Sequence, residues 1–113
     1  MSGSADNEYP YGDSYEELTC NGRDYQDSAG TLTTVAVESM QDCQSTVSGY
    51  EGVFDLSGNV SEWEDACDER TGQSDQRLVR GGLFLTSTLK CGLAGTTARD
   101  AVTTYIGFRC CSP

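Results

Sequence analysis

The sequence contains no histidine, and its seven lysine and arginine residues stand against eighteen acidic ones. Without histidine, zinc sites that need imidazole ligands are disfavoured. The formal net charge of −11 repels a phosphate backbone, so nucleic acid is not an expected partner.

Long apolar runs are also missing. The longest runs span only a few residues, far short of the roughly 20 that cross a bilayer, and no lipidation motif is present. We therefore expect no membrane insertion. The N-terminus lacks the charged-then-apolar order of a secretory signal, and its polar first residues read as expression-derived or naturally polar, which is compatible with removal of an export signal.

The cysteines are numerous for a chain of this length. An even number in a short sequence without histidine favours a disulfide framework over zinc, and hence an extracellular or periplasmic location. The six residues allow fifteen pairings, and the sequence does not choose among them. They are Cys20, Cys43, Cys67, Cys91, Cys110 and Cys111.

Cys110 and Cys111 are neighbours in a segment with strand character. Their side chains should point to opposite faces of the strand, so each needs a different partner. A redox site formed by this vicinal pair is the competing interpretation.

Length and composition favour one loop-rich domain. Of the 113 residues, only 36% are hydrophobic and 13 are glycine, which is typical of short strands and loops rather than a helical bundle. We expect an α+β fold with short antiparallel strands and little helix. Residues 1–8 are expected to be a disordered or expression-derived tail, and residues 9–113 the domain.

Local patterns predict the elements of that domain. Turn residues predict a turn at residues 9–12, and one helical turn is expected near residues 15–18. The β-type runs cover residues 31–37, 62–67, 78–85 and 105–111, the third interrupted by Gly81 and Gly82. Residues 86–104 form the longest stretch without a strong signal, and such length in a compact domain points to a functional or stapled segment.

Four patches carry a family resemblance. They are Tyr9-Pro10-Tyr11-Gly12, residues 52–63 (GVFDLSGNVSEW), Arg80-Gly81-Gly82, and residues 106–110 (IGFRC). Together they resemble the C-terminal half of the formylglycine-generating enzyme (FGE)-sulfatase domain, whose fold is a variant of the C-type lectin fold. The resemblance implies a C-type-lectin-like, FGE-sulfatase-type fold over residues 9–111.

The N-terminal half of that family domain has no counterpart in the sequence. The chain is therefore expected to be a trimmed version, a naturally minimal version, or a half that needs a partner. A half-domain should bury its exposed apolar surface, and a homodimer is the simplest solution.

The resemblance also implies a calcium site. It assigns ligand roles to the side chains of Asp55 and Glu62 and to the carbonyls of Gly58 and Val60. Calcium prefers six to eight oxygen ligands, which a tight turn between two carboxylates can supply. The alternative is that Asp55 caps the turn and Glu62 is a solvated strand residue.

A second, weaker calcium site would use Asn21 and Asp27. Asp24 could equally take the role of the aspartate.

The residues for the family's oxidation chemistry are incomplete. The enzymes use a cysteine pair that binds copper and oxidises a substrate cysteine; the first position of the pair falls on Thr86, and Cys91 aligns either with the second or with a later, non-catalytic cysteine. A threonine hydroxyl cannot replace a thiolate on a soft copper ion. The family's serine after Gly-Gly is Leu83, and an expected arginine is Ala94. The related iron oxygenases need histidine ligands, and this sequence contains no histidine.

The resemblance further implies a Cys91–Cys110 disulfide. A Cys20–Cys43 bond would then close the first loop and leave Cys67 with Cys111. Phe108 and Trp63 are expected in the core, and Arg80 and Arg109 to be satisfied by carboxylates or carbonyls.

Some proteins on this lectin-like scaffold display variable ligand-binding side chains in the segment before the final strand, which here would be residues 84–105. The plausible contacts are Thr86, Ser87, Thr96, Thr97, Arg99, Asp100 and Tyr105, and the alternative is an ordinary loop. We predict a non-catalytic, calcium-stabilised, disulfide-stapled binding or structural module for an unknown protein or small-molecule ligand. An oxidase acting on a protein cysteine is the alternative, and copper is not expected.

Overall fold

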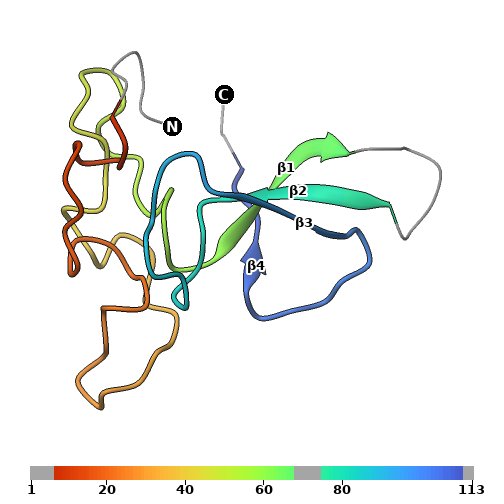
Figure 1. Cartoon of the computed structure of the whole chain (residues 1–113), viewed down its shortest axis with the longest axis horizontal. Coiled ribbons are helices and arrows are strands. Elements are labelled where there is room, and N and C mark those ends of the chain that lie inside the picture. The colour runs from red at the N-terminus through yellow and green to blue at the C-terminus, as the bar shows by residue number, and fades with distance from the viewer. Residues whose placement is uncertain (1–6, 68–74, 111–113) are drawn as a thin grey trace.

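The computed structural model describes residues 7–67 and 75–110, and its regular structure is one small sheet. The strands are β1 (Ser61–Cys67), β2 (Gln76–Arg80), β3 (Ala94–Ala98) and β4 (Ile106–Gly107). Their order across the sheet is β3-β2-β1-β4, so β3 and β4 are the two edges. Figure 1 shows the sheet on one side of the molecule and the loops that precede β1 on the other.

The described residues contain no helix, so the helical part of the expected α+β class is not confirmed, nor is the lectin-like description. The helical turn expected at residues 15–18 is an ordinary turn, in which Thr19 N–H donates to the Glu16 carbonyl (3.3 Å). No described segment could cross a membrane as an apolar helix.

The sheet is mixed rather than purely antiparallel. β1 pairs with β2, and β2 with β3, in antiparallel fashion, but β4 runs parallel to β1 through Ser61↔Ile106 and Glu62↔Gly107. The expectation of antiparallel strands alone is therefore wrong for β4. The long connection from β3 to β4 brings the chain back along β1 in the same direction, which a tight hairpin could not do.

Two predicted strands are shorter than expected. β2 ends at Arg80 because Gly81 and Gly82 adopt φ values of 92° and 67°, a region that leaves the extended conformation. A Cβ on Gly81 would lie 2.6 Å from the Leu56 carbonyl oxygen, so only glycine fits there. The final strand is reduced to two residues, and the predicted turn at residues 9–12 is confirmed by paired backbone hydrogen bonds between Tyr9 and Gly12.

Two other predictions fail in opposite ways. Residues 31–37 form no strand, because Asn59 holds this segment through its side chain in place of a neighbouring strand. In contrast, β3 forms inside the stretch at residues 86–104 that gave no strong signal. That stretch also supplies Leu89, which is 1% exposed and packs on the core cluster of Cys20 and Cys43.

A buried amide network connects the loops. Asn21 and Asn59 are almost fully buried, and Asn21 Nδ2 donates to Asn59 Oδ1 (3.1 Å) and to the Thr33 carbonyl (2.9 Å). The Asn59 amide in turn pairs with the backbone of Val35, accepting from its N–H (2.9 Å) and donating to its carbonyl (3.1 Å). Four polar contacts in the interior thus fix three loop segments, because breaking any one would strand a buried donor or acceptor.

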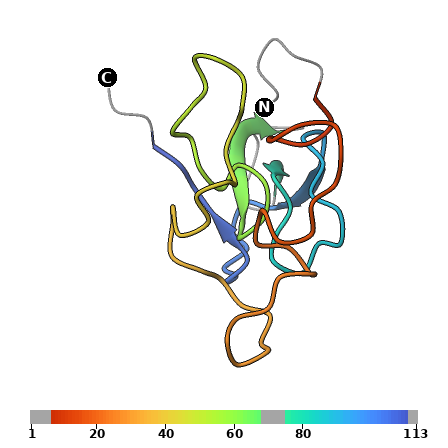
Figure 2. The same ribbon diagram turned by 90° about the vertical axis from the view of Figure 1, so that its left-hand side faces the viewer.

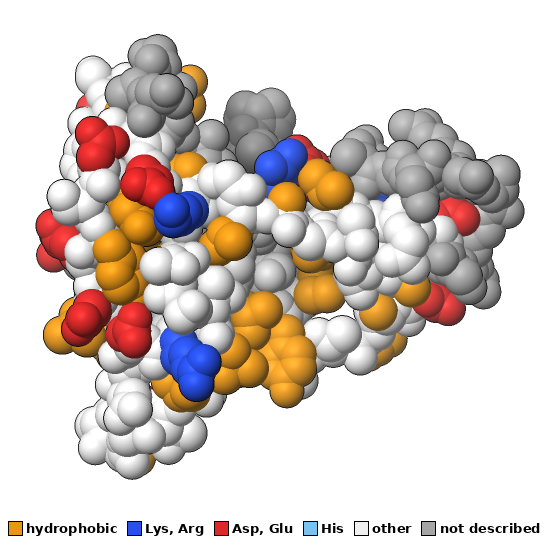
Figure 3. Space-filling view, in the orientation of Figure 1, with side chains coloured by type: hydrophobic (Ala, Val, Ile, Leu, Met, Phe, Trp, Pro, Cys, Tyr) orange, Lys and Arg blue, Asp and Glu red, His pale blue; other side chains and the backbone are white. Residues whose placement is uncertain are grey.

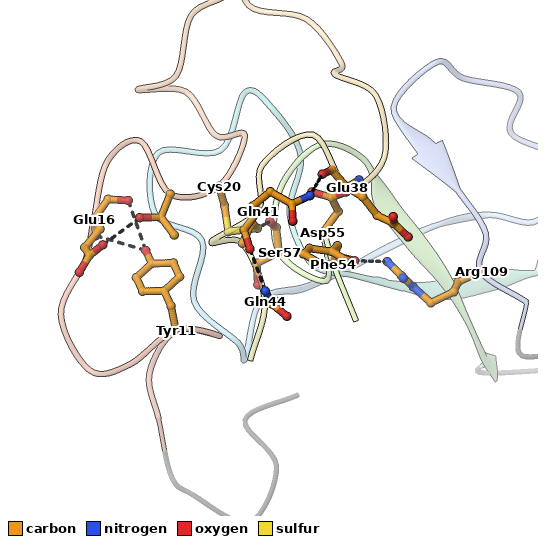
Figure 4. Close-up of a disulfide and its surroundings, with 12 residues drawn as sticks. Tyr11, Glu16, Cys20, Glu38, Gln41, Gln44, Phe54, Asp55, Ser57 and Arg109 are labelled. Carbon is orange, nitrogen blue, oxygen red and sulfur yellow. Dashed lines mark hydrogen bonds between the residues drawn. A yellow bond between two sulfur atoms is a disulfide. The ribbon is translucent and has the colours of Figure 1, made fainter. Parts of the chain in front are cut away.

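The Cys20–Cys43 disulfide is present, as predicted, and both residues are buried (Figure 4). It closes a loop with a sequence separation of 23. In the chain-entropy model a loop of that size contributes on the order of 3 kcal/mol, a large share of the stability available to a chain with so small an apolar core.

The predicted Cys91–Cys110 bond is wrong, because both residues carry free thiols. Cys91 is held beside the N-terminal segment, where its N–H donates to the Glu8 carbonyl (2.9 Å), whereas Cys110 is exposed beyond β4. The side chain of Cys67 and the whole of Cys111 lie outside the described residues, as do residues 1–6 of the predicted tail.

Phe108 is 77% exposed, which contradicts its expected place in the core. The strand that should have carried it inward ends at Gly107. Trp63, by contrast, is half-buried on β1. Figure 2 views the loop-rich half from the front, with the sheet behind it.

The turn at Gly58 provides a test of how tightly these loops are fixed. Gly58 has a φ of 90°, and a Cβ there would lie 2.6 Å from the Asn21 carbonyl oxygen. We expect Gly58→Ala to reduce the free energy of unfolding by about 2 kcal/mol or more, since it adds both backbone strain and a clash. Thermal or urea unfolding measures the change.

Gly92→Ala is the matched control, because a Cβ at Gly92 meets no atom within 4 Å. Equal stability of the two variants would show that the Gly58 turn does not constrain the fold.

Candidate functional site

Asp55 lies at the start of the turn that leads into β1. It is 6% exposed, has a φ of 57°, and its N–H donates to the Cys43 carbonyl (3.1 Å). Its Oδ2 accepts from the Glu38 N–H (2.9 Å), whereas its Oδ1 is buried with no hydrogen-bond partner. A buried carboxylate oxygen without a partner is costly, so Asp55 presents an unused ligand atom.

Glu62 stands at the other end of the turn and is bound by Arg109. Arg109 Nη2 donates to Glu62 Oε1 (2.7 Å) and Nε donates to Oε2 (3.1 Å). The same Nη2 donates to the Phe54 carbonyl (2.9 Å), as Figure 4 shows. The guanidinium thus joins the residue before Asp55 to the second residue of β1, and Glu62 is not simply a solvated strand residue.

A hard cation fits part of this arrangement. Within residues 7–67 and 75–110, no three acidic or cysteine side chains converge on one point, so a calcium ion would depend mainly on neutral oxygens. Asn21 Oδ1 and Ser57 Oγ are two such oxygens, both buried without partners and close in sequence or space to Gly58. Each Glu62 oxygen keeps a second lone pair beyond its bond to Arg109.

The weaker pair, Asn21 and Asp27, is not brought together. The Asn21 amide nitrogen is committed to the network around Asn59, whereas Asp27 Oδ1 accepts from Ala29 N–H (2.9 Å) and Thr31 N–H (2.8 Å) in its own turn. Asp24 has a different partner, since its Oδ2 accepts from the Tyr15 hydroxyl (2.6 Å).

Thr86, expected at the first copper-binding position, and Cys91, which aligns with the second or with a later cysteine of the family, line different cavities. Thr86 lines a cavity of about 260 Å³ together with Val79 and Leu93. Cys91 lines another, of about 420 Å³, with Trp63 and Arg80. Burial raises the pKa of the Cys91 thiol, which disfavours the thiolate that binds metal or attacks a substrate.

Thr86 also has a structural task that the sequence did not suggest. Its Oγ1 accepts from the Leu83 N–H (3.0 Å), and its carbonyl accepts from the Arg23 N–H (2.9 Å). These bonds close the loop after Gly82 and attach it to the N-terminal half.

The predicted ligand-contact residues are spread along the segment rather than gathered at one place. Thr96 is exposed and Thr97 half-buried on β3, while Arg99 donates to Asp75 Oδ2 (2.9 Å) beyond its end. Tyr105 is 46% exposed, with its ring centroid 5.8 Å from that of Phe84. Ser87 and Asp100 are exposed, and Thr86 is half-buried in its cavity.

Comparison with known proteins gives one family and one fold likeness. Residues 1–112 match the model of the FGE-sulfatase family, described as the sulfatase-modifying factor enzyme 1-like domain. A search of curated proteins found no match.

The crystal structure of CarF has a similar fold, with a TM-score of 0.64 and 22% sequence identity. The match covers 90% of this chain but 35% of CarF, so the chain spans about a third of the length of that protein.

The Arg109 bridge is expected to matter more than an open surface ion pair. Arg109→Gln should lower the free energy of unfolding by about 1–3 kcal/mol, because it removes bonds to a partly buried carboxylate and to a backbone carbonyl. Urea unfolding of the single and double variants with Glu62→Gln gives the coupling energy between the two residues.

Arg80→Gln is the control, since the Arg80–Glu64 pair (2.7 Å) has both side chains about 40% exposed or more. It should cost about 0.5 kcal/mol or less. If both arginine variants lose the same stability, the bridge to Phe54 and Glu62 has no special role.

Proposed function

The chain belongs to the FGE-sulfatase family, and from this membership we propose that it is a non-catalytic, disulfide-stapled binding or structural module with calcium at the Asp55 turn. The observation that carries the proposal is the separation of Thr86 and Cys91 into two cavities. Chemistry of the family's kind needs two thiolates on one copper ion, and here one position is a threonine that faces a different space.

Cys110, the other free cysteine among the described residues, is a poor substitute for the missing member of the pair. Cys110 is exposed beyond β4 and is absent from the residues that line the Cys91 cavity. Burial of Cys91 raises its pKa, so the thiol form prevails at neutral pH. Both observations support a role without oxidation of a protein cysteine.

Calcium is proposed at the Asp55 turn because an unpaired, buried carboxylate oxygen is present there. Asp55 Oδ1 would be the charged ligand, and Glu62 would contribute lone pairs that Arg109 leaves free. The carbonyls of Gly58 and Val60 are proposed to complete the set. When bound, the ion would give Asp55 Oδ1 the partner that it lacks among the described residues.

The binding role is proposed for residues 84–105, which carry exposed side chains and β3. The Cys20–Cys43 disulfide fits an oxidising compartment such as the periplasm or the extracellular space. The ligand is a protein or a small molecule, and the strongly negative net charge disfavours nucleic acid.

Calcium should raise the melting temperature of the wild-type chain. A ligand that binds only the native state adds about 2.7 kcal/mol of stability at a concentration 100 times its Kd. Scanning calorimetry in calcium and in chelator measures the difference, and Asp55→Asn should abolish it.

Asp42→Asn removes the same charge from an exposed loop position and serves as the control, with the calcium effect retained. An identical melting temperature of the wild type in calcium and in chelator would eliminate the proposed site.

Copper binding tests the non-catalytic role. The wild-type chain and Cys91→Ser should compete equally poorly with a chromophoric copper(I) chelator, since no second cysteine lines the cavity of Cys91 and one thiol holds copper(I) weakly. Neither should convert the thiol of a cysteine peptide to an aldehyde in air. Stoichiometric, tight copper(I) binding that disappears in Cys91→Ser would favour the oxidase instead.

A further inference from the structure

Within residues 7–67 and 75–110, no strand pairs with the outer edge of β3, and only its last carbonyl, that of Ala98, accepts a bond from a turn, from the Ala101 N–H (3.0 Å). β3 is at the end of the sheet, and among the described residues its pairing partner is β2 alone. The pairing is regular over five residue pairs, from Gln76↔Ala98 to Arg80↔Ala94, without a bulge. An edge of this length and regularity leaves a row of backbone donors and acceptors unpaired.

The edge also lacks the usual protection against pairing. Ala94–Ala98 contains no charged residue and no proline, and its first three residues are exposed. Natural edge strands are commonly blocked by lysine, proline, a bulge or a covering loop. The absence of these features in β3 is compatible with an edge that is used.

An apolar cavity opens beside this edge. Its volume is about 260 Å³, and β3 contributes Ala94 and Gly95 to its wall, opposite Val79, Leu83 and Leu93. A Cβ on Gly95 would lie 3.6 Å from Val79 Cγ2, so the missing side chain of Gly95 faces the cavity. A strand laid along β3 could place a side chain at this point.

We propose that β3 binds an extended peptide segment of another protein by strand addition, and that one aliphatic side chain of this peptide enters the cavity beside Gly95. The inference rests on the proposed binding function and names its ligand class. Backbone hydrogen bonds to β3 would supply affinity, and the cavity would select the side chain.

The size of the cavity favours such a peptide over a second copy of the chain. Two copies joined through β3 would offer each other only alanine, glycine and threonine side chains, which are too small to fill it. A leucine, isoleucine or methionine side chain is large enough and apolar. The net charge of −11 on each copy also opposes self-association.

Charge does not select acidic residues in the peptide. The basic side chains at the two ends of β3 already have acidic partners, Arg80 with Glu64 and Arg99 with Asp75. Acidic side chains gather over the loop-rich side of the face in Figure 3, and others lie at the far end of the sheet. The apolar cavity, rather than charge, is therefore the feature that would select the ligand.

Selection of a random nonapeptide display library on the full wild-type chain tests the proposal. We expect enrichment of peptides that share one aliphatic position. The synthetic consensus peptide should bind at least tenfold more weakly to Gly95→Val, whose side chain occupies the cavity mouth, and equally well to Gly92→Ala. Melting curves verify that both variants fold.

Backbone pairing is tested separately. Two versions of the consensus peptide are compared, one N-methylated at its odd-numbered amides and one at its even-numbered amides. One of the two should bind at least tenfold more weakly than the unmodified peptide, because methylation removes the donors that face the strand edge. If both methylated peptides bind as tightly as the unmodified one, strand addition is wrong.

Each of three other outcomes would overturn the inference. If the peptides bind Gly95→Val as tightly as they bind the wild type, the ligand binds elsewhere. This result overturns the inference but not the proposed binding function. A selection without enrichment overturns the inference, while the calcium and copper experiments still judge the proposed function. Light scattering tests for a second copy of the chain as the occupant. If the wild type is a dimer and Thr97→Lys is a monomer, a second copy binds at β3 and the peptide proposal is wrong.

Discussion

The arrangement of this chain depends on two buried amides, Asn21 and Asn59. The described structure has no helix and a small sheet, so most of the backbone polar groups before β1 cannot pair in regular elements. The two side chains take over part of that role by bonding to each other and to the backbone at Thr33 and Val35. In a low-dielectric interior such a network has little tolerance for change, because every member depends on the others.

The turn that contains Gly58 and Asn59 connects the loops to the sheet. Gly58 N–H donates to the Gly81 carbonyl (2.6 Å), and the Phe84 N–H donates to the Asn59 carbonyl (3.1 Å). Arg109 then closes the opposite side by reaching Glu62 and Phe54 from beyond β4. The proposed calcium site and the loop that lines the 260 Å³ cavity are therefore two sides of one rigid turn. None of these contacts uses a cysteine side chain, so they do not depend on a thiol pair.

Much of the site was predictable where short motifs specify local geometry. The turn around Gly58, the glycines after Arg80 and the strand at β1 follow from conformational freedom and side-chain type, which act within a few residues. The role of residues 31–37 was not predictable, because a β-branched run forms a strand only if a neighbour pairs with it, and here Asn59 binds the run instead. β3 illustrates the reverse, since a weak local signal became a strand once β2 lay beside it.

The sequence by itself determined the family, the Cys20–Cys43 bond as one option among several, and a threonine at position 86, where the resemblance implies the first copper-binding cysteine. These are properties of residue identity and order. Only the tertiary structure decided that Thr86 and Cys91 line separate cavities, that Cys91 and Cys110 remain unpaired, and that Phe108 is exposed. The physical reason is that distances between remote segments depend on how the loops are fixed, here by buried amides whose partners are far away in the chain.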